Sequence, residues 1–219
     1  MQTVPARITG VCHGAVLAVF LLLFTVAAPA EEENGKYDGA SAVVATLHET
    51  LVDIMKNAKE LGFQGRYDRV EPLVAERFDT PLIVKVILSR YWNEMTAAQQ
   101  EEFLQLFHRL SVSTYASRFT SWDGEDFVEV GRETLKAGRI LIKTELRTRG
   151  SNDKPVRLEY LMHHSEEGRW MIISVIANGV NDLSLKRAEY AAVLKERGYE
   201  GLVADLKEKI EKMATDSGS

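Results

Sequence analysis

Residues 140–147, ILIKTELR, place Ile140, Ile142 and Leu146 on one face of an extended chain and charged side chains on the other. This period of two is typical of a strand with one buried face. It holds across residues 127–177, where short polar turns separate four such runs. Turns this short allow hairpins but not parallel crossovers, so we expect an antiparallel meander. The predicted strands are 127–135, 139–148, 156–164 and 170–177.

Helical periodicity surrounds this sheet on both sides. Apolar residues recur at helical spacing over 39–59, the glycines of 61–65 interrupt them, and a second stretch follows around Val70 and Val74. Thr80-Pro81 predicts a helix start, and Thr96 with Gln99 has the form of a capping box that begins a long helix towards Tyr115 or Phe119. Two further helical stretches, 182–197 and 201–213, end the chain.

Together these patterns predict an α+β fold. N-terminal helices pack on one face of a curved antiparallel sheet of about four strands, C-terminal helices follow, and the architecture is NTF2-like or cystatin-like. Some proteins of this architecture are isomerases or hydrolases with an ionisable pair in the cone between helices and sheet. The candidates for such a pair are Asp126, Glu129, Glu133 and His108. A non-catalytic interaction module with a solid core is the other alternative.

The N-terminus has the form of a secretion signal. Arg7 precedes the apolar run AVLAVFLLLFTVAA at 15–28, and Ala28-Pro29-Ala30 is a small-residue cleavage site. We therefore expect a signal peptide at 1–30, cleaved near Ala30, and a single exported domain at 31–219. The run is shorter than the roughly 20 residues of a membrane span, although an uncleaved anchor remains the alternative.

Composition excludes several classes of function. The formal net charge is −5, and nucleic-acid binding requires a basic face. The single cysteine, Cys12, lies within the predicted signal, so the exported domain has no thiol chemistry. The histidines fall on separate elements, and the adjacent His163 and His164 point to opposite faces of a strand. We expect no metal, no cofactor and no catalytic residues, since no phosphate-binding loop, nucleophile elbow or dinucleotide fingerprint is present.

A set of motifs carries a family resemblance. They are Tyr91-Trp92, Gln99, Phe103, Phe107, TYASRF at 114–119, GEDF at 124–127, GRWMI at 168–172 and GVNDL at 179–183. In this order and spacing they resemble the MlaC/Ttg2D family of periplasmic phospholipid-binding proteins, auxiliary components of ABC transporters. The stretches SLKRAEY at 184–190 and GYEGL at 198–202 look most like the hopanoid-associated HpnM branch. Ser174 and Asn178 stand where the family often has acids.

The resemblance implies a periplasmic shuttle for a phospholipid or hopanoid. Such a protein holds lipid in an apolar cavity between helices and sheet, and exchanges it with lipid-transport complexes of the inner and outer membranes. The expected lining comes from the concave face of the sheet and the helices over it, although an apolar stripe of this kind is also typical of plain core. The expected lipid-binding residues are Phe103, Phe107, Tyr115, Val128, Val130, Ile142, Leu158, Tyr160, Ile172 and Val175.

Overall fold

A computed structural model describes residues 37–217, so the predicted signal lies outside the described part of the chain. The helices before the sheet begin at Asp38, and a single bent helix follows the sheet. Their bounds are α2 (Asp38–Lys56), α3 (Ala58–Arg77), α4 (Thr80–Leu88), α5 (Arg90–Glu94), α6 (Ala97–Arg118) and α7 (Asp182–Asp216).

The sheet is an antiparallel meander in the order β1-β2-β3-β4-β5, which confirms the predicted α+β class. The four expected strands are present within a few residues of their predicted ends, and a two-residue fifth strand pairs with the fourth. Their bounds are β1 (Glu125–Thr134), β2 (Ile140–Thr148), β3 (Val156–His164), β4 (Trp170–Ala177) and β5 (Val180–Asn181).

The helix starts follow the expected capping chemistry. At the start of α6, Thr96 accepts a hydrogen bond from the Gln99 amide while the Gln99 side chain accepts one from the Thr96 amide, so the capping box is confirmed. Asp79 precedes α4, and its carboxylate accepts from the Leu82 amide at 3.0 Å. Each device satisfies backbone donors that the first helical turn leaves free.

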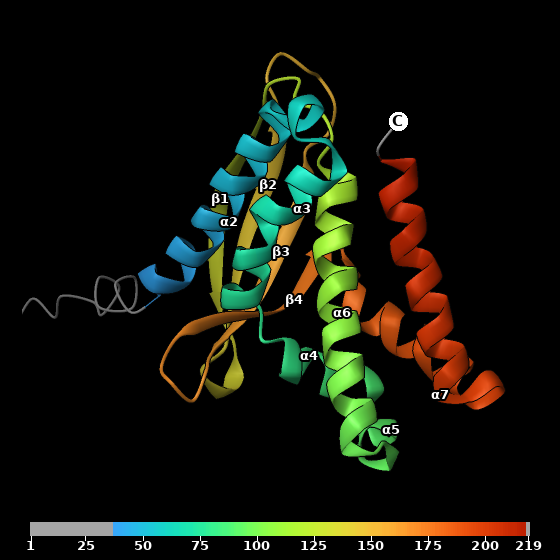
Figure 1. The fold of residues 1–219 in the computed structure, drawn as a ribbon. Coiled ribbons are helices and arrows are strands. Elements are labelled where there is room, and N and C mark those ends of the chain that lie inside the picture. The colour runs from blue at the N-terminus through green and yellow to red at the C-terminus, as the bar shows by residue number, and fades with distance from the viewer. Residues whose placement is uncertain (1–36, 218–219) are drawn as a thin grey trace, which may run out of the picture.

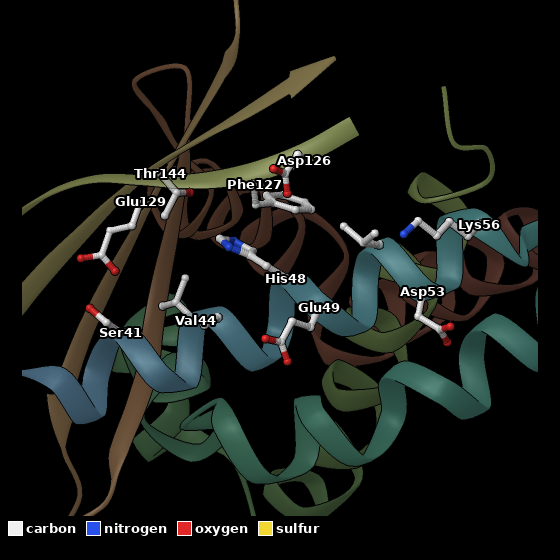
Figure 2. Close-up of a pocket in the computed structure, with 12 residues that line it drawn as sticks. Ser41, Val44, His48, Glu49, Asp53, Lys56, Asp126, Phe127, Glu129 and Thr144 are labelled. Carbon is white, nitrogen blue, oxygen red and sulfur yellow. The ribbon is translucent and has the colours of Figure 1, made fainter. Parts of the chain in front are cut away.

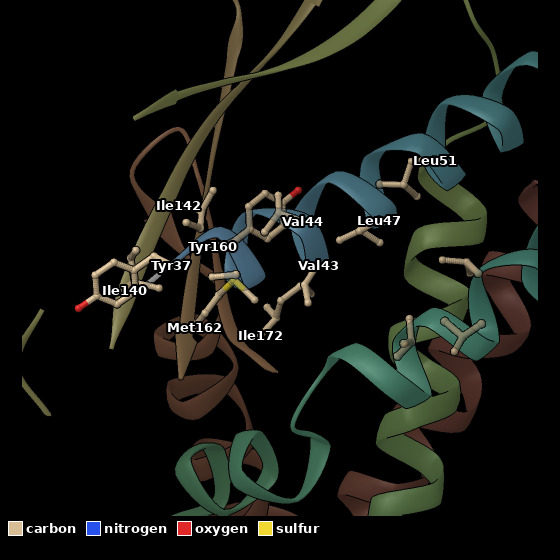
Figure 3. Close-up of a cluster of buried hydrophobic side chains, with 14 of the residues drawn as sticks. Tyr37, Val43, Val44, Leu47, Leu51, Ile140, Ile142, Tyr160, Met162 and Ile172 are labelled. Carbon is tan, nitrogen blue, oxygen red and sulfur yellow. The ribbon is translucent and has the colours of Figure 1, made fainter. Parts of the chain in front are cut away.

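The helices lie on both faces of one part of the sheet (Figure 1). One cluster of buried side chains joins α2 and α3 to the inner face of β2, β3 and β4, as Figure 3 shows for Leu47, Ile142 and Tyr160. A second cluster joins α4, α6 and α7 to Ile173 of β4. The apolar pattern on both faces of β4 therefore has a direct cause, because Ile172 belongs to the first cluster and Ile173 to the second.

The first strand faces the opposite way to our expectation. Val128 pairs with Glu145, on the charged outer face of β2, and Val130 is 49% exposed beside the irregularity between Glu129 and Gly131. Phe127 instead turns inward, opposite Leu146. Before the bulge Phe127 and Glu129 form the inner face of β1, opposite Leu146 and Thr144. After it the parity changes and Arg132 lies opposite Ile142, so apolar character alone does not identify the inner face of this strand.

Candidate functional site

An apolar cavity of about 280 Å³, here called the chamber, lies between β3, β4 and the helices α6 and α7. The chamber is lined by Phe78, Ile83, Phe107, Leu110, Ser111, Thr114, Tyr115, Arg118, Phe119, Leu158, Tyr160, Ile173, Ser174, Val175, Ala177, Val180, Asp182, Leu183, Leu185 and Lys186.

Aromatic rings form much of the inner wall of the chamber. The Tyr115 ring stacks on Phe119 with centroids 6.0 Å apart and meets Phe78 edge-on at 5.9 Å. Burial raises the pKa of Tyr115 and of Tyr160 well above the ordinary range of a tyrosine. Both phenols are therefore neutral at physiological pH, so the inner wall carries no charge that an apolar ligand would have to desolvate.

The rim of the chamber combines exposed apolar side chains with charges. Val180 and Leu185 are 52% and 57% exposed where β5 leads into α7. Lys186 pairs with Asp182 one turn earlier in α7, and Arg118 stands at the last turn of α6. An apolar interior with a few polar groups around it is typical of a small-molecule binding site.

A second cavity of about 500 Å³, here called the groove, lies between α2 and the strands β1 and β2. Figure 2 shows Val44 and His48 projecting from α2 towards β1, whereas Glu49 and Asp53 lie on the far side of the same helix. Two of its carboxylates are paired, Asp53 with Arg69 and Glu129 with Arg132. The groove is lined by Ser41, Val44, Ala45, His48, Glu49, Val52, Asp53, Lys56, Asp126, Phe127, Glu129 and Thr144.

A thin wall separates the groove from the chamber. His48 lines the groove, Tyr160 lines the chamber, and the imidazole Nε2 lies 2.9 Å from the phenol oxygen. The Phe127 ring stacks on His48 with centroids 4.0 Å apart and an interplanar angle of 10°. Burial lowers the pKa of His48 to about 4, so the imidazole is neutral at physiological pH.

The residues expected to bind lipid fall into three groups. Five of them line the chamber: Phe107, Tyr115, Leu158, Tyr160 and Val175. Three are packed in the core away from it: Phe103, Ile142 and Ile172. Val128 lies on the outer side of β1 and Val130 is exposed at the bulge, and neither of them lines the chamber.

Sequence reasoning missed the groove and part of the chamber wall. Phe78 and Phe119 lie at helix ends, where periodicity is weakest, and Leu183 lies at the start of α7. The aromatic character of the two phenylalanines was the available signal, because a large ring at a helix end is often buried against a neighbouring element. The groove has mixed lining, so no hydrophobic pattern could have located it.

The side chains proposed for an enzyme do not form one acid–base pair. His108 pairs with Glu71 at 3.0 Å and Glu133 pairs with Lys143. Asp126, Glu129 and His48 all line the groove, but the imidazole of His48 is hydrogen-bonded to the phenol of Tyr160 and not to either carboxylate. Within residues 37–217, no three acidic, cysteine or histidine side chains gather as metal ligands, and none of the helices has the length and apolarity of a membrane span.

Comparison with known proteins places this geometry in a family. One solved structure is that of a phospholipid-binding protein from Ralstonia solanacearum in complex with a phospholipid. It matches with a TM-score of 0.68 and 21% identity over 79% of this chain and 97% of that chain. A family model described as MlaC protein matches residues 45–208, which include α3 to β5 and most of α2 and α7. The chain therefore belongs to the MlaC family.

Proposed function

We propose that this protein is a periplasmic lipid carrier that shuttles a phospholipid or a hopanoid-type lipid between transport complexes of the inner and outer membranes. The observation that carries the proposal is the apolar, charge-free inner wall of the chamber, which opens at a rim with exposed Val180 and Leu185. Membership in the MlaC family and the fold shared with a phospholipid-binding protein support it.

The apolar wall of the chamber provides the cover from water that transport of hydrocarbon requires. Each methylene left in water costs about 0.8 kcal/mol, so hydrocarbon chains leave a bilayer very slowly without cover. A carrier lowers this barrier by replacing water with apolar side chains, and it needs no catalytic group. Its affinity has only to match that of a bilayer, because tighter binding would prevent release.

The direct test is lipid retention by the purified protein. We expect protein from its native host to carry co-extractable lipid in near-equal molar amount, measured by mass spectrometry. Replacing Val175 in the chamber by phenylalanine should lower this occupancy severalfold, because the added ring occupies the space of the ligand. Val156→Phe is the matched control, since Val156 lies on the neighbouring strand outside the chamber. Empty protein that also takes no lipid from vesicles contradicts the proposal.

Export is a separate part of the proposal. The signal-like residues 1–30 and the MlaC family both favour the periplasm. N-terminal sequencing of the protein purified from its host should find a start near Glu31. An intact Met1 on membrane-associated protein would instead support the uncleaved anchor.

A further inference from the structure

The chamber alone is small for a lipid. Its volume of about 280 Å³ lies below the roughly 300–1,000 Å³ usual for sites that enclose a drug-sized ligand. The groove adds about 500 Å³ on the other side of the wall. A lipid held by this protein needs more space than the chamber offers, and the nearest space is the groove.

Side-chain contacts alone hold the wall between the two cavities closed. Its polar link is the hydrogen bond between His48 and Tyr160, and both of these groups are neutral at physiological pH. Its apolar part is ring contact, with the Phe127 and Phe119 centroids 6.4 Å apart across the wall. A rotation of the Tyr160 and His48 side chains would break one neutral hydrogen bond and the ring contacts of His48 with Phe127 and Tyr160, without changing the strand pairing.

From this arrangement we infer that the groove and the chamber are two ends of one site for an amphiphile, with the side chains of His48 and Tyr160 as the gate between them. The inference rests on the proposed function. Hydrocarbon occupies the chamber, whose inner wall is apolar and uncharged. The polar end of the lipid occupies the groove.

The charges of the groove define the polar end that it accepts. Glu49 and Asp126 line the groove and have no ion-pair partner within residues 37–217. Lys56 also lines the groove, and its ammonium group lies over the Trp122 ring. Figure 2 shows Glu49 on α2 and Asp126 on β1. Carboxylates that have no ion-pair partner attract a positively charged or hydrogen-bond-donating group and repel an anionic one. The groove therefore fits a headgroup that carries an amine or hydroxyls.

Occupancy of the groove can be tested with a single introduced thiol. Ala45 is exposed and lines the groove, whereas Ala42 is exposed on the same helix outside it. With Cys12 replaced by serine, A45C and A42C are loaded from phosphatidylethanolamine vesicles and treated with a maleimide. Bound lipid should slow the modification of A45C at least tenfold and leave A42C unchanged.

The lipid content of each loaded sample, measured by mass spectrometry, separates the two proposals. Lipid-loaded protein in which A45C reacts as fast as in the empty protein overturns the two-ended site but leaves the carrier function intact. Protein that acquires no lipid overturns both. As a further test, phosphatidylglycerol with the same chains should protect A45C less, and equal protection by both lipids overturns the assignment of the polar end to the groove.

A substitution at Tyr160 tests the gate separately from the occupancy of the groove. Tyr160→Phe keeps the ring and removes the hydroxyl that meets His48, so we expect lipid uptake from vesicles to become severalfold faster. Tyr190→Phe is the matched control, because Tyr190 is also buried but its hydroxyl has no hydrogen-bond partner among residues 37–217. An uptake rate of Tyr160→Phe equal to that of the wild type overturns the gate.

Discussion

The environment of His48 couples the wall between the cavities to the stability of the fold. The residue is 8% exposed, and burial lowers the pKa of its imidazole from 6.5 to about 4. Since the unfolded chain keeps an ordinary histidine pKa, the unfolded state binds more protons than the folded state between these two values. The stability contribution of neutral His48 is therefore complete above pH 6.5 and is lost as the pH falls towards 4.

We expect His48→Gln to reduce the acid sensitivity of the protein. Glutamine can still hydrogen-bond to Tyr160 but does not titrate, so the loss of unfolding free energy from pH 7 to pH 4.5 should be smaller by roughly 2–3 kcal/mol. Urea unfolding at the two pH values measures this. If wild type and variant lose the same stability, His48 is not buried as a neutral group.

Arg66 ties together three chain segments far apart in sequence. Its guanidinium donates to the carbonyls of Ala116 at 2.8 Å, Ala58 at 2.9 Å and Ser217 at 2.8 Å, and the residue is 3% exposed. It therefore satisfies acceptors at the last turn of α6, at the start of α3 and after the end of α7.

Arg66→Met should cost about 3 kcal/mol or more, because it leaves buried carbonyls without donors. Arg69→Met on the same helix is the control, since the pair of Arg69 with Asp53 is about half exposed and pairs of that kind contribute about 1 kcal/mol or less. Urea unfolding of both variants tests the difference. Equal losses would show that the three buried hydrogen bonds of Arg66 add nothing beyond a surface pair.

Gly198 bends the last helix, α7, around the second core cluster. Gly198 has φ +67° and ψ −170°, a conformation almost restricted to glycine. The bend lets the segment after it place Leu202, Leu206 and Ile210 in the cluster with Phe103 of α6. The two helices expected at 182–197 and 201–213 are thus the two arms of α7.

Gly198→Ala should lower the unfolding free energy by about 1–3 kcal/mol. A Cβ at this position would meet no atom within 4 Å, so the cost is conformational rather than steric. Gly131→Ala is the control, since its Cβ would also meet nothing and its φ is not in the left-handed range. A loss no larger for Gly198→Ala than for Gly131→Ala would mean that α7 relaxes without its bend.

The elements that sequence could predict are those whose signals are local. The capping box at Thr96, the proline start of α4 and the alternation of β2 depend on neighbouring residues, and all appear where we expected them. The orientation of β1 depends on its pairing register with β2, including the shift between Glu129 and Gly131. Which side chains line the chamber depends on how the helices pack on the sheet, so the different places of Phe103 and Phe107, four residues apart on one helix, could not be predicted from sequence.

An empty chamber costs the fold stability. Its apolar side chains then face water or empty space instead of packed neighbours, so the free energy of burying them is lost. Close packing of β3 and β4 against α6 would avoid this cost. A protein that keeps such a space in its core gains stability when a ligand fills it.

We therefore expect lipid to stabilise the fold as well as to bind. At a free ligand concentration of 100 times Kd, binding adds about 2.7 kcal/mol, and in a domain of this size that raises Tm by roughly 5–10 °C. Calorimetry of delipidated protein with and without phosphatidylethanolamine vesicles measures the shift. Val175→Phe fills part of the chamber, so its lipid-free Tm should be equal or higher while its lipid-dependent shift becomes smaller. A lipid-dependent rise in the Tm of Val175→Phe as large as that of the wild type would place the stabilising ligand outside the chamber, because the added ring would clash with a ligand bound inside it.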